Sequence, residues 1–222
     1  MKSIKHIYLL IPMLFTGCIG TDIVEDTIVP IRLSIGNQVS ELRVGDSYQF
    51  TADYFNEFGE LTIAQINWTS SNPIVISINN QGIATANTLG EATISANFGE
   101  AIDAVTVIAG ATTTETTSDR NGTFTGVNSY QVSGGFGLSE VSGGLKLTFD
   151  ENFRTSSGPG LFVYLSNQAN GVGGAIEVGR LTKNSESQTY MIEGDVQLRT
   201  YNFVLIYCKP FGVTFGRGTF ND

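Results

Sequence analysis

Few side chains in this sequence can carry redox or soft-metal chemistry. The 222 residues include two cysteines, Cys18 and Cys208, and one histidine, His6. A thiolate is a nucleophile and a metal ligand, and its reactivity depends on how far its pKa is lowered. Both Cys18 and His6 lie near the N-terminus, so Ser-His-Asp, Cys-His and His/Cys zinc sites are not indicated. Thiol chemistry in the folded part of the chain would therefore have to pass through Cys208.

The first seventeen residues have the pattern of an export signal. Lys2 and Lys5 precede an apolar stretch, residues 7–15, which is interrupted only by Pro12. This stretch is much shorter than the roughly 20 apolar residues that a membrane-spanning helix needs. We therefore predict that residues 1–17 are a signal peptide.

Residues 14–18 read Leu-Phe-Thr-Gly-Cys and resemble a bacterial lipobox, with Phe15 where leucine is more common. The resemblance implies that Cys18 is cut to become the first residue and is acylated there. Stable anchoring needs two lipid signals, which the acyl chains of such lipoproteins supply. Residues 18–29 would then be a lipidated tether, and the protein would lie in the cell envelope, at the outer membrane or cell surface. The alternative is an ordinary signal peptide followed by a chance cysteine.

The composition is typical of an exported all-β protein. Lys and Arg number 12 against 21 Asp and Glu, for a net charge of −9, and there are 26 glycines. A nucleic-acid-binding surface has the opposite charge, so no nucleic-acid partner is expected. No segment beyond the signal keeps the apolar spacing of an amphipathic helix. The length suits two domains.

A threonine-rich segment, residues 109–121, has no large apolar residue to bury and is predicted to be a linker. Residues 30–108 before it show alternating apolar and polar residues, as in residues 48–54 and 92–96, separated by turn signals. Four segments resemble a bacterial Ig-like domain of group two: residues 68–73, 75–78, 81–86 and 89–96. The resemblance implies a seven-stranded sandwich that acts as a spacer or adhesion module, with Trp68 in its core.

Residues 122–222 are also β-patterned, with strands expected at residues 145–149, 161–166, 190–192 and 203–208. They resemble the DM-thirteen domain, a proposed electron-transfer domain, and would form a second sandwich or a barrel. The matching segments are residues 122–124, 132–134, 152–153, 158–166, 179–181, 188–190 and 207–216. Two positions depart from the family pattern: Tyr130 stands where histidine is frequent, and Gly218 where alanine is usual.

Two interpretations of Cys208 remain open. In a strand it shares an apolar face with Val204 and Ile206, which favours a buried thiol that acts as a small hydrophobe. Lys209 would point to the opposite face and would not lower the thiol pKa.

The resemblance implies instead that Cys208 works as a redox thiol or a haem ligand. Tyr207, Phe211 and Phe215 would then wall a pocket beside it. The identity of any cofactor is left open, with haem as one candidate. Met191 is a conceivable second ligand, but its apolar strand favours a place in the core.

The sequence thus favours a non-enzymatic, lipid-anchored envelope protein. In this interpretation the Ig-like domain is a spacer that displays the DM-thirteen-like domain to a protein or glycan partner. The alternative is an electron-transfer module that acts through Cys208. No catalytic residue and no metal site is assigned.

Overall fold

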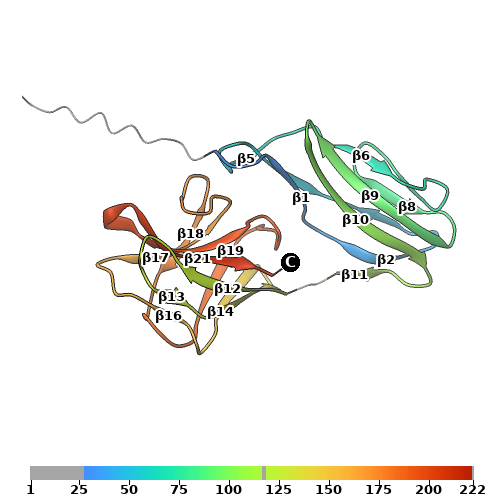
Figure 1. The fold of residues 1–222 in the computed structure, drawn as a ribbon. Coiled ribbons are helices and arrows are strands. Elements are labelled where there is room, and N and C mark those ends of the chain that lie inside the picture. The colour runs from blue at the N-terminus through green and yellow to red at the C-terminus, as the bar shows by residue number, and fades with distance from the viewer. Residues whose placement is uncertain (1–27, 117–118, 222) are drawn as a thin grey trace, which may run out of the picture.

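The computed structural model describes residues 28–116 and 119–221. Its strands build two halves that lie side by side and enclose two separate hydrophobic cores (Figure 1). The fold is all-β, as predicted, and its one described helical element is a single 3-10 turn. No helix in the described ranges has the length and apolar character needed to cross a membrane.

The N-terminal half contains three sheets, with the strand orders β1-β4-β5, β11-β2-β10-β9-β6 and β3-β8-β7. Trp68 is buried in the core between them, where its ring lies 6.0 Å from that of Phe50. The strands are β1 (Arg32–Ile35), β2 (Val39–Arg43), β3 (Ser47–Gln49), β4 (Ala52–Phe55), β5 (Leu61–Thr62), β6 (Asn67–Ser70), β7 (Ile76–Ile78), β8 (Ile83–Ala86), β9 (Gly90–Phe98), β10 (Ala101–Gly110) and β11 (Thr114–Glu115).

Residues 48–54 do not form the single strand that their alternation predicts. The chain leaves β3, which pairs with β8, and enters β4, which pairs with β1. The change of sheet occurs at Phe50 and Thr51, where the Thr51 N–H donates to Asn37 Oδ1 at 2.7 Å. The apolar side chains still face one core, so the alternation predicts the burial correctly but not the strand pairing.

The C-terminal half is one eight-stranded, nearly closed barrel-like sheet, with the order β18-β17-β20-β21-β12-β14-β15-β19, and a small β13-β16 sheet. Its core is rich in phenylalanine, and the Phe124 ring lies within 5.3 Å of three other phenylalanine rings. The elements are β12 (Arg120–Gly126), β13 (Val132–Ser133), β14 (Gly135–Val141), β15 (Gly144–Phe149), β16 (Arg154–Thr155), β17 (Leu161–Ser166), β18 (Ile176–Arg180), β19 (Gln188–Glu193), β20 (Phe203–Cys208), η1 (Lys209–Phe211) and β21 (Val213–Phe220).

The segment predicted as an exposed linker is partly built into sheets. Ala109 and Gly110 end β10, and Thr114 and Glu115 pair with β2. Arg120 begins β12 and is buried. The absence of large apolar residues did not prevent this, because sheet pairing uses the backbone and a guanidinium can be buried when carbonyl oxygens surround it.

The packing explains the glycine at position 218. A Cβ atom placed there would lie 2.5 Å from Phe136 Cε1 and 2.9 Å from Phe124 Cε1. The two rings occupy the space that an alanine methyl group would need, so the packed core favours glycine at this position.

Candidate functional site

Cys208 ends β20 and is completely buried, with 0% of its surface exposed. It belongs to the same core as Val204 and Ile206, as the alternation of the strand predicts. Its two neighbours across the sheet are Leu161 and Val213. The thiol therefore has the surroundings of a small core hydrophobe.

The three aromatic residues predicted to wall a pocket lie in different places. Phe215 is buried in the core with Cys208, and its ring stacks on Tyr130 at 3.6 Å. Tyr207 lies on the other side of β20, where its ring is 5.7 Å from that of Tyr164. Phe211 is 70% exposed. The structure therefore does not gather these side chains around the thiol.

Lys209 is turned away from Cys208. Its Nζ lies 2.7 Å from Glu177 Oε2 and 4.7 Å from the centre of the Phe162 ring. The Tyr164 hydroxyl donates to the same Glu177 oxygen at 2.6 Å. These two donors lower the pKa of Glu177, with Lys209 the larger cause, and burial raises the pKa of Tyr164. Lys209 thus forms a surface ion pair with Glu177 and does not lie beside the thiol.

Met191 is not in the core, which corrects the expectation for this residue. It is 54% exposed on β19, while its neighbours Tyr190 and Ile192 point inward. The alternation of the strand places Met191 on the outer face, away from Cys208. Cys18 lies outside the described residues.

A second group of functional side chains lies where the two halves meet. Arg32 of β1 donates from Nη2 to Asn167 Oδ1 at 2.8 Å and to the Thr200 carbonyl at 2.5 Å. Its Nη1 donates to the Arg199 carbonyl at 3.3 Å, and Ser34 Oγ donates to the same oxygen at 2.9 Å. Arg32 therefore joins the first strand of the N-terminal half to the loop between β19 and β20.

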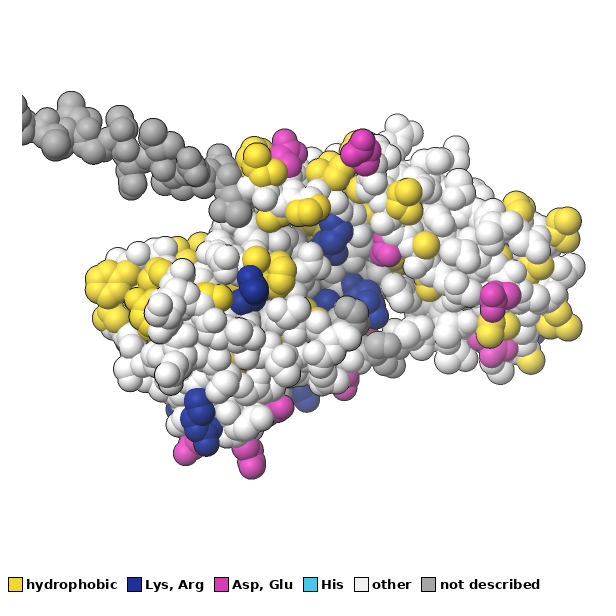
Figure 2. Space-filling view, viewed as in Figure 1, with side chains coloured by type: hydrophobic (Ala, Val, Ile, Leu, Met, Phe, Trp, Pro, Cys, Tyr) yellow, Lys and Arg dark blue, Asp and Glu magenta, His cyan; other side chains and the backbone are white. Residues whose placement is uncertain are grey.

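Arg120 binds the same loop from the other side. Its Nη1 donates to the carbonyls of Leu198 and Tyr201 at 3.1 and 2.7 Å, and its guanidinium lies 3.6 Å from the centre of the Phe220 ring. Figure 2 shows basic side chains gathered in the crease between the two halves.

Burial at the interface shifts the pKa values of two charged side chains, Arg32 and Asp53. Burial, followed by the nearby Arg120 cation, lowers the pKa of Arg32 to about 10. Burial also raises the pKa of Asp53, although the Thr200 hydroxyl, 3.2 Å from Asp53 Oδ2, and Arg32 act in the opposite direction. Sequence reasoning missed Arg32 and Arg120, because their partners lie far away along the chain.

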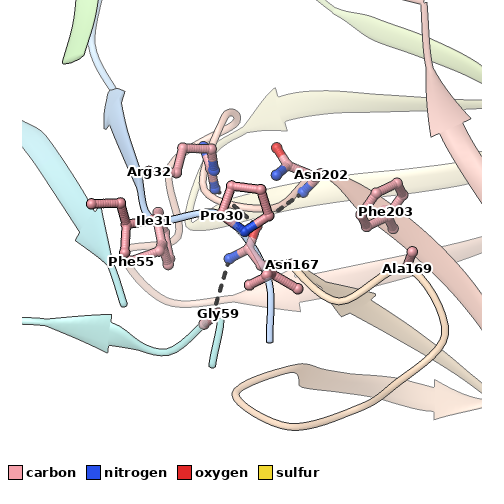
Figure 3. A pocket seen from close by; sticks show the side chains of 10 residues that line it. Pro30, Ile31, Arg32, Phe55, Gly59, Asn167, Ala169, Asn202 and Phe203 are labelled. Atoms are coloured by element: carbon pink, nitrogen blue, oxygen red, sulfur yellow. Dashed lines mark hydrogen bonds between the residues drawn. The ribbon is translucent and has the colours of Figure 1, made fainter. Parts of the chain in front are cut away.

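A cavity of about 400 Å³ opens beside Arg32, between the two halves (Figure 3). Its walls are mostly apolar, and its polar lining includes Arg32, Asn167 and Asn202. The apolar wall residues are Val29, Pro30, Ile31, Phe55, Ala169 and Phe203. None of the residues that surround Cys208 lines this cavity, so the thiol and the cavity are separate candidate sites.

Residues 123–220 match the family described as "Electron transfer DM13". No curated protein matches the sequence. Two solved structures of surface-layer proteins share 13% identity with this chain. The match to the S-layer protein rSbsC(31-844) covers 85% of this chain and 27% of the S-layer chain, with a TM-score of 0.29. The match to domains 1-6 of the surface layer protein SbsC covers 88% of this chain and 40% of that structure, with a TM-score of 0.30. The chain thus spans less than half of either structure.

Proposed function

Because residues 123–220 form a DM13 domain, we propose that the chain is a non-enzymatic, lipid-anchored envelope protein that displays this domain as a binding module. Residues 30–108 are an Ig-like spacer in this proposal, and the acylated Cys18 is the anchor. The partner is a protein or a glycan at the cell surface.

The complete burial of Cys208 is the observation that carries the non-enzymatic part of the proposal. A redox thiol must meet its partner, or lie against a bound group, as a thiolate. Cys208 instead packs among apolar side chains, and the adjacent cation, Lys209, is paired with Glu177. Within the described residues, no cluster of three or more His, Cys, Asp and Glu side chains is placed to hold a metal ion.

The interface supports the spacer role. A spacer that holds the second half in one position is consistent with the hydrogen bonds that Arg32, Ser34 and Gln168 make across the two halves. These bonds reach backbone carbonyl oxygens, whose positions are set by the fold. We infer that the two halves move as one body at the end of the tether.

Membrane fractionation of cells that express the full chain tests the anchor. The wild-type protein should remain with the membrane pellet, and Cys18→Ser should appear in the soluble fraction. The matched control, Cys208→Ala, should remain in the pellet. Retention of Cys18→Ser in the pellet would overturn the anchoring proposal.

The second candidate function is electron transfer through Cys208, and the family description of residues 123–220 favours it. In this alternative, Cys208 would be the ligand of a haem, and its sulfur would supply thiolate coordination. The buried surroundings of the thiol do not fit a group of that size without rearrangement. A visible absorption band in the purified protein that is lost in Cys208→Ala would favour this function over display.

A further inference from the structure

The cavity between the two halves has the features of a small-molecule site. Binding pockets in proteins are commonly 300–1,000 Å³, mostly apolar, and placed at domain interfaces with a few polar groups. This cavity holds about 400 Å³ and has one charged residue, Arg32, in its lining. At about 30 Å³ per water-sized group, it has room for roughly a dozen non-hydrogen atoms.

Arg32 forms no ion pair within the described part of the chain, although the carboxylates of Asp53 and Asp103 act on it from nearby. Its three hydrogen bonds reach neutral oxygens, those of Asn167, Arg199 and Thr200. Its buried Nε–H has no hydrogen-bond partner there. A guanidinium has five N–H donors and binds carboxylates well. Three are used, so one N–H of Nη1 remains for an anion, whereas the Nε–H is closed off from solvent.

The charges around Arg32 also favour an anion in the cavity. Burial and the nearby Arg120 cation lower the pKa of Arg32, so an anion in the cavity would relieve both effects. Asp53 and Asp103 act on Arg32 in the same direction as an anion would. Neither of them lines the cavity, and no other carboxylate of the described residues does.

Asn202 supplies a second polar contact. Its backbone N–H donates to Asn167 Oδ1 at 3.2 Å. Its side-chain carboxamide, however, makes no hydrogen bond with any residue of the described ranges, although the residue lines the cavity. An amide offers both donors and an acceptor, so it can hold the polar end of a ligand whose apolar part packs against Phe55 and Phe203.

We propose that this cavity binds a small free carboxylic acid, with its apolar chain between Phe55 and Phe203 and its carboxylate toward Arg32 and Asn202. A membrane phospholipid has far more atoms than the cavity holds. The proposal goes beyond surface display, and it depends on neither the Cys18 anchor nor the Cys208 thiol.

Calorimetric titration of residues 19–222, which retain both cores, tests the proposal with two probes. Octanoate and 1-octanol have the same apolar chain, but only octanoate is an anion. We expect octanoate to bind about tenfold more tightly, because a charge-assisted hydrogen bond is stronger than a neutral one. Equal affinities, or no binding of octanoate at millimolar concentration, would overturn the proposal.

Two variants locate the site. Ala169→Phe should fill the cavity and remove the binding of both probes, whereas Ala104→Phe, on the exposed face of β10, should leave binding unchanged. Arg32→Lys should keep the preference for octanoate, and Arg32→Met should abolish it. Unchanged octanoate binding in Ala169→Phe would place the probe elsewhere and overturn the proposal.

Amide NMR shifts in the wild-type protein give a reading that needs no variant. Octanoate should shift the backbone amides of Ala169, Asn202 and Phe203, which line the cavity. Shifts confined to other residues would contradict the proposal even if a variant failed to fold. Loss of this site would leave the anchoring and display proposals standing, because their tests use Cys18 and Cys208.

Discussion

Arg32 and Arg120 bind successive backbone carbonyls of one loop, although Arg32 lies in the first strand and Arg120 at the end of the threonine-rich segment. Arg120 donates hydrogen bonds to the carbonyls of Leu198 and Tyr201, and Arg32 donates to those of Arg199 and Thr200. Four consecutive carbonyl oxygens are thus held by two guanidinium groups. The loop between β19 and β20 is thereby fixed to the N-terminal half and to the start of the barrel at once.

Replacing Arg32 by methionine should weaken the interface. The Thr200 carbonyl would lose the donor that binds it, at a cost of about 1–3 kcal/mol for an unsatisfied buried acceptor. Urea denaturation should show a lower free energy of unfolding. Arg43→Met, at an exposed position of β2, is the matched control and should have little effect. Equal stability of the two variants would show that the interface hydrogen bonds do not hold the halves together.

Replacing Asp53 by asparagine should stabilise the protein near neutral pH. Burial raises the pKa of Asp53 above its ordinary value of 3.8, so the folded state favours the protonated carboxyl. The contribution of Asp53 to stability is therefore fully present below the unfolded pKa and is lost as the pH rises through the folded pKa.

The stabilising effect of Asp53→Asn should accordingly be largest near pH 7 and should shrink as the pH falls through the raised pKa of Asp53, where the wild-type carboxyl becomes protonated. Thermal melts over this pH range measure it. The exposed Glu100→Gln variant is the control for a general change in net charge. A destabilising effect near pH 7 would mean that the electrostatic attraction of Arg32 and the hydrogen bond from Thr200 outweigh the burial of Asp53.

Gly218→Ala should destabilise the barrel by about 1–3 kcal/mol, the usual cost of overpacking a core. The added methyl group would collide with the rings of Phe136 and Phe124. Gly137→Ala is a matched control, because its Cβ would approach only the flexible Asn121 side chain, at 3.1 Å. Adding Phe136→Leu to Gly218→Ala should recover part of the loss. If Gly218→Ala did not lower the free energy of unfolding, the rings of Phe136 and Phe124 would have to move aside easily.

The sequence predicted the strand that carries the thiol better than the residues that join the halves. Strand Phe203–Cys208 and the burial of its Cys208 face follow from local alternation, and the structure has both. Arg32 could not be assigned a role in the same way, because its acceptors lie more than 130 positions away along the chain. Contacts of that kind are determined by the docking of the halves.

The aromatic residues near Cys208 show the same limit. Tyr207, Phe211 and Phe215 are close to the thiol in the sequence. In the structure Phe215 lies in the core, Tyr207 lies on the other side of β20, and Phe211 of the 3-10 turn is exposed. The stack of Tyr130 on Phe215 joins β21 to a distant loop, and no local pattern could reveal it. The cavity beside Arg32 escaped prediction for the same reason.

Cys208→Ser should cost more stability than Cys208→Ala. A serine hydroxyl would enter an apolar core, where a polar group without a partner costs about 1–3 kcal/mol by mutational measures. Alanine removes one sulfur atom and leaves a small void. Chemical denaturation of the two variants compares them directly. If serine were the better tolerated substitution, the thiol would have a polar or open environment that contradicts its burial.

The reactivity of Cys208 tests the central claim most directly. Residues 19–222 would be treated with a chromogenic disulfide reagent, first in the native state and then after unfolding. The buried thiol predicts no reaction in the native protein and one thiol per chain after unfolding. Rapid reaction of the native protein would place Cys208 in an accessible site, and electron transfer would replace display as the proposed function.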